Sequence, residues 1–325
     1  MPTKPLSFFS DKHGEISLCT LSAINWGNIK SPGDFERVCR LAVRGLDELL
    51  DYQKYPVLAA ELSTAKRRPL GIGIINFAFW LAKNDLNYQD IDKDGLELVD
   101  EWAEAWSYYL IKASADLAID KGNIDGIYET KYGDGITPNQ TYKQELDELV
   151  PHKERQDWEG LREQLKATGI RNSTLMALMP AETSAQISNS TNGIEPPRSL
   201  VSIKQSKHGV LKQVVPEYRR LQNKYDLLWD QKSPEGYIKI MAVLQKYIDQ
   251  GISVNTSYNP QFYEDDKIPM SVMIQHLLMF YKYGGKQLYY FNTFDGQGEL
   301  DVNKLNEEQL APGLVDDEDC DSCKI

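Results

Sequence analysis

The chain has 325 residues, of which 41% are hydrophobic and 26% charged, a composition typical of a globular protein and not of a disordered or fibrous one. Its formal charge of −12 argues against a general affinity for nucleic acid or for an anionic membrane, because no basic face is expected to outweigh that field. The longest apolar run, 71–82, is too short to cross a bilayer, and the N-terminus has no signal-peptide core, so we expect a cytoplasmic protein.

The first predicted elements are helices. Ser31-Pro32 predicts a helix start, and apolar residues recur at helical spacing over 35–50. A second amphipathic pattern covers 96–120 and is followed by Gly122, a common residue just past a helix end. A shorter helix is expected over 157–169.

Further along the chain, short apolar strands and helices are expected to alternate. The strands are expected at 173–179, 252–258 and 287–293, and the helices at 216–229, 234–251 and 269–283. Strands separated by helices imply crossover connections and therefore a mostly parallel sheet between helices. The expected fold class is α/β, followed by an acidic tail of about thirty residues.

The tail ends in a Cys-x-x-Cys pair, Cys320 and Cys323, behind the acidic run 316–319. Two thiols this close together, on a segment with little apolar surface to bury, are typical of a mobile dithiol that carries electrons. A zinc site would require two further ligands, and the four histidines are scattered along the sequence, so no metal site is expected.

Four more segments carry the strongest motifs. They are Ile16–Ser22, with Cys19 at its centre, Met179–Gln186, Ser188–Pro197 and Leu288–Thr293. Together with the cysteine tail, and in this order, they resemble the C-terminal half of the large catalytic subunit of class Ia ribonucleotide reductase. The resemblance extends over essentially the whole chain. It implies the second half of a ten-stranded α/β barrel, a parallel half-sheet with its helices, over 1–293, and a flexible acidic tail over 294–325.

Cys19 lies in an alternating stretch, which predicts a strand residue. From the pattern alone, a lone cysteine there is most simply a small buried hydrophobic residue. The resemblance implies instead that Cys19 is one of two active-site thiols that are oxidised to a disulfide as they reduce the ribose 2′ carbon. Cys39, among apolar residues at helical spacing, is expected to be a packing residue.

A second candidate site follows the predicted strand 173–179. Its residues are Pro180, Ala181, Glu182, Thr183 and Ser184. Because the segment opens a short helix, its backbone N–H groups can converge on an anion without a lysine. The alternative is an ordinary helix start with a capping box from Thr183 to Gln186. The resemblance implies the cradle of the substrate diphosphate, with Ala181 where the family pattern has serine.

Tyr289 and Tyr290 are adjacent in a predicted strand, so their side chains are expected to point to opposite faces. Read from the pattern alone, such a pair most often fills a sheet. The resemblance implies that the pair conducts a radical from the small subunit toward the active site. A phenol with a pKa near ~10 keeps its proton at neutral pH, so its oxidation must move a proton as well as an electron.

The resemblance also implies partners. The chain itself would bind no cofactor; a metal-radical cofactor of the diiron-tyrosyl type would lie in the small subunit, and thioredoxin or glutaredoxin would restore Cys320 and Cys323. The substrate would be a ribonucleoside diphosphate. The family's thiyl-radical cysteine and the thiol that pairs with Cys19 belong to its N-terminal half and have no match here. We therefore expect a fragment or the downstream product of a split, viral-type gene, which needs the N-terminal part to complete the barrel.

The function predicted from the sequence is thus reduction of ribonucleoside diphosphates to deoxyribonucleoside diphosphates, as the C-terminal component of an enzyme complex. An alternative is a non-catalytic binding or assembly module whose Cys-x-x-Cys tail recruits thioredoxin-like partners. A third is an independent thiol-disulfide oxidoreductase. Substitution of Cys19 distinguishes the first two, because an enzyme would lose multiple turnover whereas a binding module would associate unchanged.

Overall fold

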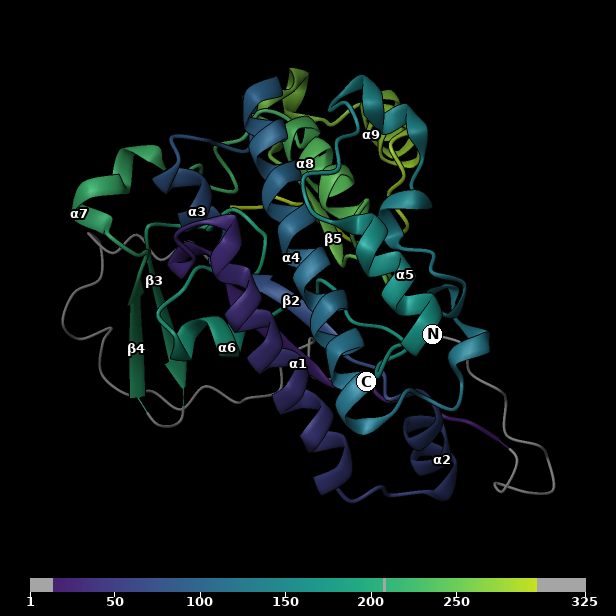
Figure 1. Ribbon diagram of the computed structural model, residues 1–325. Coiled ribbons are helices and arrows are strands. Elements are labelled where there is room, and N and C mark those ends of the chain that lie inside the picture. The colour runs from purple at the N-terminus through teal and green to yellow at the C-terminus, as the bar shows by residue number, and fades with distance from the viewer. Residues whose placement is uncertain (1–13, 207–208, 297–325) are drawn as a thin grey trace.

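The computed structural model describes residues 14–206 and 209–296, which form an α/β fold of mixed helices and strands (Figure 1). The helices are α1 Phe35–Tyr52, α2 Leu58–Arg67, α3 Phe77–Lys83, α4 Lys93–Lys121, α5 Trp158–Thr168, α6 Glu182–Ile187, α7 Tyr218–Leu221, α8 Glu235–Gln245 and α9 Met270–Lys282. The strands are β1 Leu21–Asn25, β2 Gly71–Ile75, β3 Val201–Ser206, β4 Gly209–Val214, β5 Val254–Tyr258 and β6 Leu288–Thr293. Within the described ranges, every helix is too short or too polar to span a bilayer.

Four of the strands form two parallel pairs. β1 pairs with β2 in a regular register from Leu21–Gly71 to Asn25–Ile75, and β5 pairs with β6. Long helical connections link the partners in each pair, which is what parallel pairing requires. The prediction of parallel strands separated by helices is therefore confirmed for β5 and β6, whereas β2 was not among the predicted strands.

The segment 174–178 lies between the two pairs. It forms isolated parallel bridges on both sides, Ile72 with Met176 and Leu178 with Ile252. The predicted strand 173–179 is thus in the expected place but is not a regular strand. Its bridges connect β1, β2, 174–178, β5 and β6 in chain order.

The side chain of Asp249 takes over part of the hydrogen bonding of this irregular segment. Its carboxylate accepts hydrogen bonds from the backbone N–H groups of Leu175 (2.7 Å) and Met176 (2.9 Å) and from the Tyr132 hydroxyl (2.9 Å). Burial raises the pKa of Asp249, and the two N–H groups oppose that shift because they favour the ionised form. The carboxylate therefore stabilises two backbone donors that a regular strand partner would otherwise satisfy.

The core lies between the sheet and the long helix α4, which runs through the centre of the molecule beside α1 (Figure 1). Most of α4 is buried, as expected of a helix with apolar residues on more than one face. Six aromatic rings from the start of α1, from α3, from α4 and from the turn after β1 pack at centroid distances of 5.1–6.2 Å: Trp26, Phe35, Phe77, Trp80, Trp102 and Trp106. This cluster fixes the helices against the amino-terminal strand pair.

The helix ends follow their sequence signals. Asp157 caps α5 by accepting a hydrogen bond from the Gly160 N–H at 3.0 Å, and Gly122 and Gly169 follow α4 and α5 with positive φ values of 84° and 75°. The expected helices over 35–50, 96–120 and 157–169 are all present. The helix expected over 234–251 is present but ends earlier, at Gln245, and gives way to turns.

The prediction of a helix over 216–229 is wrong. Only α7 and a following 3₁₀ turn are helical, because Glu217 adopts φ 50° and the residues after the 3₁₀ turn form hydrogen bonds that are not those of a helix. The N–H of Leu228 donates to Pro197 O at 2.9 Å, and the Tyr225 hydroxyl donates to Pro216 O at 2.7 Å.

Strands β3 and β4 form an antiparallel hairpin that was not predicted. Val201 pairs with Val214 and Ser206 with Gly209, and the hairpin lies at the side of the molecule, away from the parallel strands (Figure 1).

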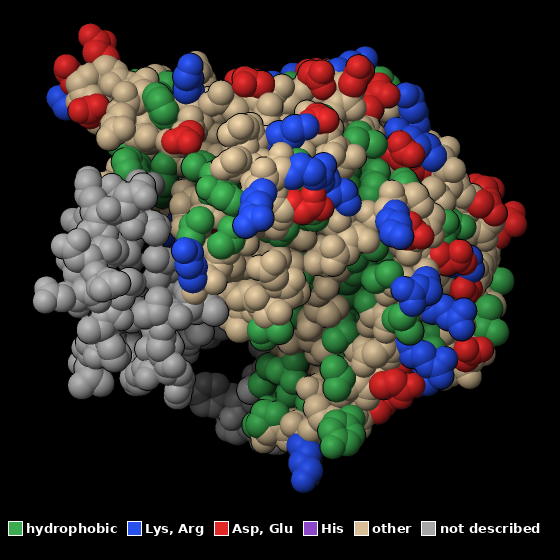
Figure 2. Space-filling model, turned by 90° about the vertical axis from the view of Figure 1, so that its left-hand side faces the viewer, with side chains coloured by type: hydrophobic (Ala, Val, Ile, Leu, Met, Phe, Trp, Pro, Cys, Tyr) green, Lys and Arg blue, Asp and Glu red, His purple; other side chains and the backbone are tan. Residues whose placement is uncertain are grey.

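Over the described part of the face shown in Figure 2, lysine and arginine side chains are interspersed with aspartate and glutamate. That face therefore carries no extended single-sign patch.

Asp249→Ala is expected to lower the free energy of unfolding by about 3 kcal/mol, because it leaves two enclosed N–H groups and a tyrosine hydroxyl without their acceptor. Denaturant unfolding of both proteins in the same assembly state measures the difference. Asp125→Ala, at an exposed position, is the matched control and is expected to change stability by less than about 0.5 kcal/mol. Equal effects of the two substitutions would contradict the role given to Asp249.

Candidate functional site

A cavity of about 610 Å³ lies beside the second pair of parallel strands. The segment after 178 lines it together with residues from the loop 192–198, the turns before α8, and strands β5 and β6. Seven of the ten residues singled out by sequence line it: Pro180, Ala181, Glu182, Thr183, Ser184, Tyr289 and Tyr290. The fold therefore brings the predicted diphosphate loop and the predicted radical-conducting pair to one cavity.

The predicted diphosphate loop has no side-chain cap. Helix α6 starts at Glu182 with Ala181 as its N-cap residue, and Ala181 forms no side-chain cap hydrogen bond. The alternative of a capping box from Thr183 to Gln186 is therefore wrong, because Thr183 lies inside the helix. Ala181 is buried and packs with Ala185 and Ile75, which leaves the exposed side chains of Thr183 and Ser184 at the cavity.

The backbone segment that follows α6 is held in place by a series of hydrogen bonds from side-chain amides and hydroxyls. Asn76, in a left-handed conformation with φ 65° after β2, donates through Nδ2 to Asn25 Oδ1 at 2.9 Å, and its Oδ1 accepts from the Thr191 N–H at 3.0 Å. Asn25 in turn donates to Ser190 Oγ at 2.8 Å. Because Asn76 is 2% exposed, these bonds fix the loop to the ends of β1 and β2.

Tyr289 and Tyr290 lie in a β-bulge. Val254 pairs with Leu288 and Thr256 with Phe291, so two residues of β6 oppose the single residue Asn255 of β5. The two phenol rings lie 4.3 Å apart between centroids, and both line the cavity. The expectation that they face opposite sides of the sheet is therefore wrong, because the extra residue of the bulge interrupts the alternation of a regular strand.

The side chain of Asn255 connects the bulge to the loop 192–198. Its Oδ1 accepts a hydrogen bond from the Tyr290 N–H at 3.0 Å, and its Nδ2 donates to Glu195 Oε1 at 2.5 Å. Burial raises the pKa of Glu195, whereas the hydrogen bond from Asn255 and the charge of Arg198 oppose that shift. Arg198 is the only cationic side chain among the described residues that line the cavity.

Three further polar atoms at the cavity have no hydrogen-bond partner among the described residues: Asn192 Oδ1, Gln231 Nε2 and the hydroxyl of Tyr237. Burial raises the pKa of Tyr237 well above that of an ordinary tyrosine, so the hydroxyl keeps its proton. Buried polar atoms are normally satisfied, and these three therefore give the cavity a capacity to hydrogen-bond a polar ligand or water.

Cys19 lies outside the cavity lining. The prediction that Cys19 is a strand residue is wrong, because β1 starts only at Leu21. Before β1 the backbone pairs elsewhere: the Ile16 N–H donates to Ala59 O. Leu21 does line the cavity. Cys19 is exposed, although partial burial raises the pKa of its thiol, so it does not lie in a sealed interior. Cys39 is fully buried in α1, as predicted for a packing residue.

Cys320 and Cys323 lie outside the described residues. Among residues 14–206 and 209–296, no group of three or more histidine, cysteine, aspartate or glutamate side chains is arranged to hold a metal ion. The structure thus groups the loop and the tyrosines, places Cys19 two residues before a lining residue, and leaves the tail cysteines undescribed.

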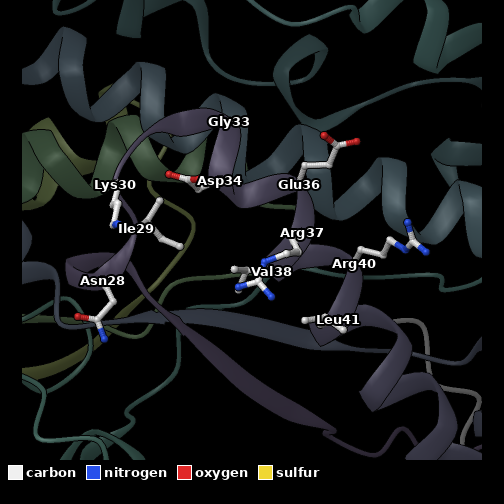
Figure 3. Close-up of a pocket in the computed structure, with 10 residues that line it drawn as sticks. All are labelled: Asn28, Ile29, Lys30, Gly33, Asp34, Glu36, Arg37, Val38, Arg40 and Leu41. Atoms are coloured by element: carbon white, nitrogen blue, oxygen red, sulfur yellow. The ribbon is translucent and has the colours of Figure 1, made fainter.

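A second cavity, of about 780 Å³, lies at the start of α1 (Figure 3). Asn28 and Lys30 come from the segment before the helix, and Arg37 and Arg40 from the helix itself. None of the residues singled out by sequence lines this cavity, so its larger volume does not make it the candidate site.

Sequence reasoning assigned no role to Glu195 or Asn255. Glu195 lies in the motif Ser188–Pro197, and Asn255 lies only within the resemblance that extends over the whole chain, so the family resemblance was the only available signal. Their contact joins residues 60 positions apart, which no local periodicity can indicate.

The fold and the cavity define an α/β protein with a polar site built onto a parallel sheet. The family model described as ribonucleotide reductase, barrel domain, matches residues 7–291. The chain is 54% identical over 325 residues to the ribonucleoside-diphosphate reductase subunit alpha of Haemophilus influenzae, which covers all of the chain and 41% of that protein.

Two other relatives give similar coverage. Identity is 49% over 278 residues to the ribonucleoside-diphosphate reductase 1 subunit alpha of Escherichia coli, covering 85% of the chain and 35% of that protein. It is 42% over 325 residues to the subunit alpha of Enterobacteria phage T4, covering 99% of the chain and 41% of that protein. The chain therefore belongs to the ribonucleotide reductase barrel-domain family, and it spans about two-fifths of the length of these relatives.

Glu195→Gln is expected to make the protein more stable than the parent at neutral pH. The pKa of Glu195 in the folded protein lies above its unfolded value of about 4.3, so ionisation of this carboxyl opposes folding. The stability that the protein has below about pH 4.3 is therefore partly lost as the pH rises through the folded-state pKa. Glutamine cannot ionise, and it keeps an oxygen that can accept from Asn255. The difference in Tm between the two proteins is therefore expected to grow as the pH rises from about 4 to about 7.

Thermal unfolding at several pH values measures this difference. Glu61→Gln, on an exposed surface of α2, is the matched control and is expected to show little of this pH dependence. A Tm difference for Glu195→Gln that does not change with pH would show that the carboxyl is not held in an unfavourable environment.

Proposed function

We propose that this chain is the C-terminal component of a ribonucleoside-diphosphate reductase large subunit. In this proposal it reduces ribonucleoside diphosphates to deoxyribonucleoside diphosphates, together with the N-terminal part of the large subunit and a small subunit that generates the radical. The observation that carries the proposal is the shared cavity, where the loop from Pro180 to Ser184 meets Tyr289 and Tyr290.

The loop would hold the substrate diphosphate. Thr183 and Ser184 present exposed hydroxyl donors at the cavity, and Arg198 supplies a positive charge there. Glu182 carries the wrong charge for a phosphate and would contact the backbone or the sugar. Because the lining is mostly neutral and polar, binding would depend on placed hydrogen bonds more than on net charge.

The tyrosine pair would conduct the radical. A centroid distance of 4.3 Å places the two phenol rings in contact, and this short distance suits transfer of a radical between them. Tyr290 would be nearer the small subunit and Tyr289 nearer the active site. The metal-radical cofactor, predicted to be diiron-tyrosyl, would lie in the small subunit.

Cys19 would be one of the two thiols that supply the electrons for reduction of the sugar and become a disulfide. A thiolate from Cys320 or Cys323 would then attack that disulfide, and thioredoxin or glutaredoxin would reduce the resulting tail disulfide. In this way each turnover consumes two electrons, which the external dithiol replaces. The cytoplasmic location expected from the sequence stays a prediction.

We also propose that the parallel segments are half of a ten-stranded barrel. The bridges that connect β1, β2, 174–178, β5 and β6 in chain order support this. Exposed apolar side chains support it as well, since β6 and α9 expose a group of them: Leu288, Tyr289, Tyr290, Phe291, Met270, Ile274, Leu277, Leu278 and Tyr281. Such a surface is expected to be covered in the assembled protein.

Replacement of Cys19 tests the enzymatic function. In the complex of this chain with the N-terminal part and the small subunit, Cys19→Ser is expected to abolish repeated formation of deoxyribonucleoside diphosphate, because the disulfide cannot form. Cys39→Ala, at the buried cysteine of α1, is the matched control and is expected to retain turnover. Unchanged association without any product from the parent complex would instead favour the non-catalytic assembly module.

The half-barrel proposal has a separate test. The isolated chain is expected to unfold broadly and at a lower temperature than its complex with the N-terminal part, because the partner covers the exposed apolar surface. Calorimetry of the chain with and without that part measures the shift. A sharp unfolding transition of the chain alone, with no binding of the N-terminal part, would contradict the proposal.

A further inference from the structure

The β-bulge at Tyr289 and Tyr290 depends on a side chain of the neighbouring strand. In a regular parallel pair, backbone groups satisfy each other, but the extra residue of a bulge interrupts the ladder. Here the N–H of Tyr290 donates to the side-chain oxygen of Asn255 at 3.0 Å. The bulge is therefore stabilised by one side chain at the position that both tyrosines oppose.

Glu195 determines which way the Asn255 amide is turned. Its carboxylate accepts from Asn255 Nδ2 at 2.5 Å, so the amide oxygen is left to face the Tyr290 N–H. Only a side chain that donates at one end and accepts at the other fits between these two groups. An aspartate at this position would place two carboxylates together, and an alanine would leave both groups without a partner.

From this geometry we infer that Asn255, oriented by Glu195, is a positioning residue that clamps the bulge and thereby holds both phenol rings in contact on one side of β6. Without the clamp, β6 can relax to a regular ladder, and one of the two rings then turns to the opposite face. The inference deepens the proposed function and rests on it only where it concerns turnover. The ring geometry itself can be tested independently.

The experiment uses the complete chain in complex with the N-terminal part and the small subunit, with 3-fluorotyrosine at position 290. The ¹⁹F signal reports whether the ring of residue 290 still lies against that of Tyr289, which is 4.3 Å away in the structure. A Tyr289→Leu variant provides the signal expected when the contact is lost. Asn255→Ala and Asn255→Asp are expected to move the signal toward that reference.

The kcat of each variant is expected to fall where its ¹⁹F signal shows that the contact between the two rings is lost. Both Asn255 variants are expected to lower kcat on the order of 100-fold, with little change in the KM for the nucleoside diphosphate, since misplacement of a group by about 1 Å has effects of this size. A general loss of structure would not separate kcat from KM in this way. Asn259→Ala is the matched control, because Asn259 lies just after β5 and, like Asn255, both donates a hydrogen bond, to Trp229 O, and accepts one, from the Gln261 N–H. It is expected to keep the parent ring signal.

A double substitution makes the test decisive. In Asn255→Asp with Glu195→Gln, the glutamine amide donates to the new aspartate, whose other oxygen accepts from the Tyr290 N–H, so the clamp is rebuilt with its polarity reversed. This variant is expected to recover the parent ring signal and most of kcat.

Two results would overturn the inference: a parent-like ring signal in Asn255→Ala, or a folded double variant whose ring signal remains that of Asn255→Asp. Absence of product from the parent complex would count against the proposed function alone, because the ¹⁹F comparison needs no turnover.

Discussion

The contact of the Asp249 carboxylate with the backbone of Leu175 and Met176 is the constraint on which the candidate site depends. The segment 174–178 connects the two parallel strand pairs only through isolated bridges, and Asp249 supplies hydrogen bonds that a regular strand would obtain from its neighbour. The chain leaves this segment directly into Pro180. The position of the predicted diphosphate loop beside β5 and β6 therefore follows from where the Asp249 carboxylate holds the backbone.

The same principle recurs on the other side of the cavity. At the bulge of β6, the amide of Asn255 again replaces a missing backbone partner, this time for Tyr290. In both places a polar side chain satisfies a backbone N–H where the sheet is irregular, and in both places the irregularity directs cavity-lining residues. Leaving a backbone N–H group enclosed without an acceptor costs more free energy than the net gain from one side-chain hydrogen bond. Replacement of Asp249 or Asn255 by an apolar residue of similar size is therefore destabilising.

These two contacts also explain what the sequence could and could not predict. The helices α1, α4 and α5 carry their own signals in apolar spacing, an Asp157 cap and glycines past their ends, and they form where expected. Three features depend on partners from 35 to 74 residues away: the irregularity of 174–178, the bulge in β6, and the start of β1 only after Cys19. The spacing of apolar residues cannot indicate partners at that distance. The family motifs include seven residues that line the cavity, although they lie far apart in the sequence, whereas Cys19 from the same set of motifs lies outside the lining.

The cavity and the incomplete edge of the sheet lie at the same place. β6 bears both tyrosines of the candidate site, and its residues from Leu288 through Phe291 are 39–50% exposed. A partner that covers this strand would at the same time exclude water from the two phenol rings, which favours transfer of an electron and a proton between fixed groups over loss to solvent. Under the proposed function, assembly and reactivity would thus be coupled through one strand, β6.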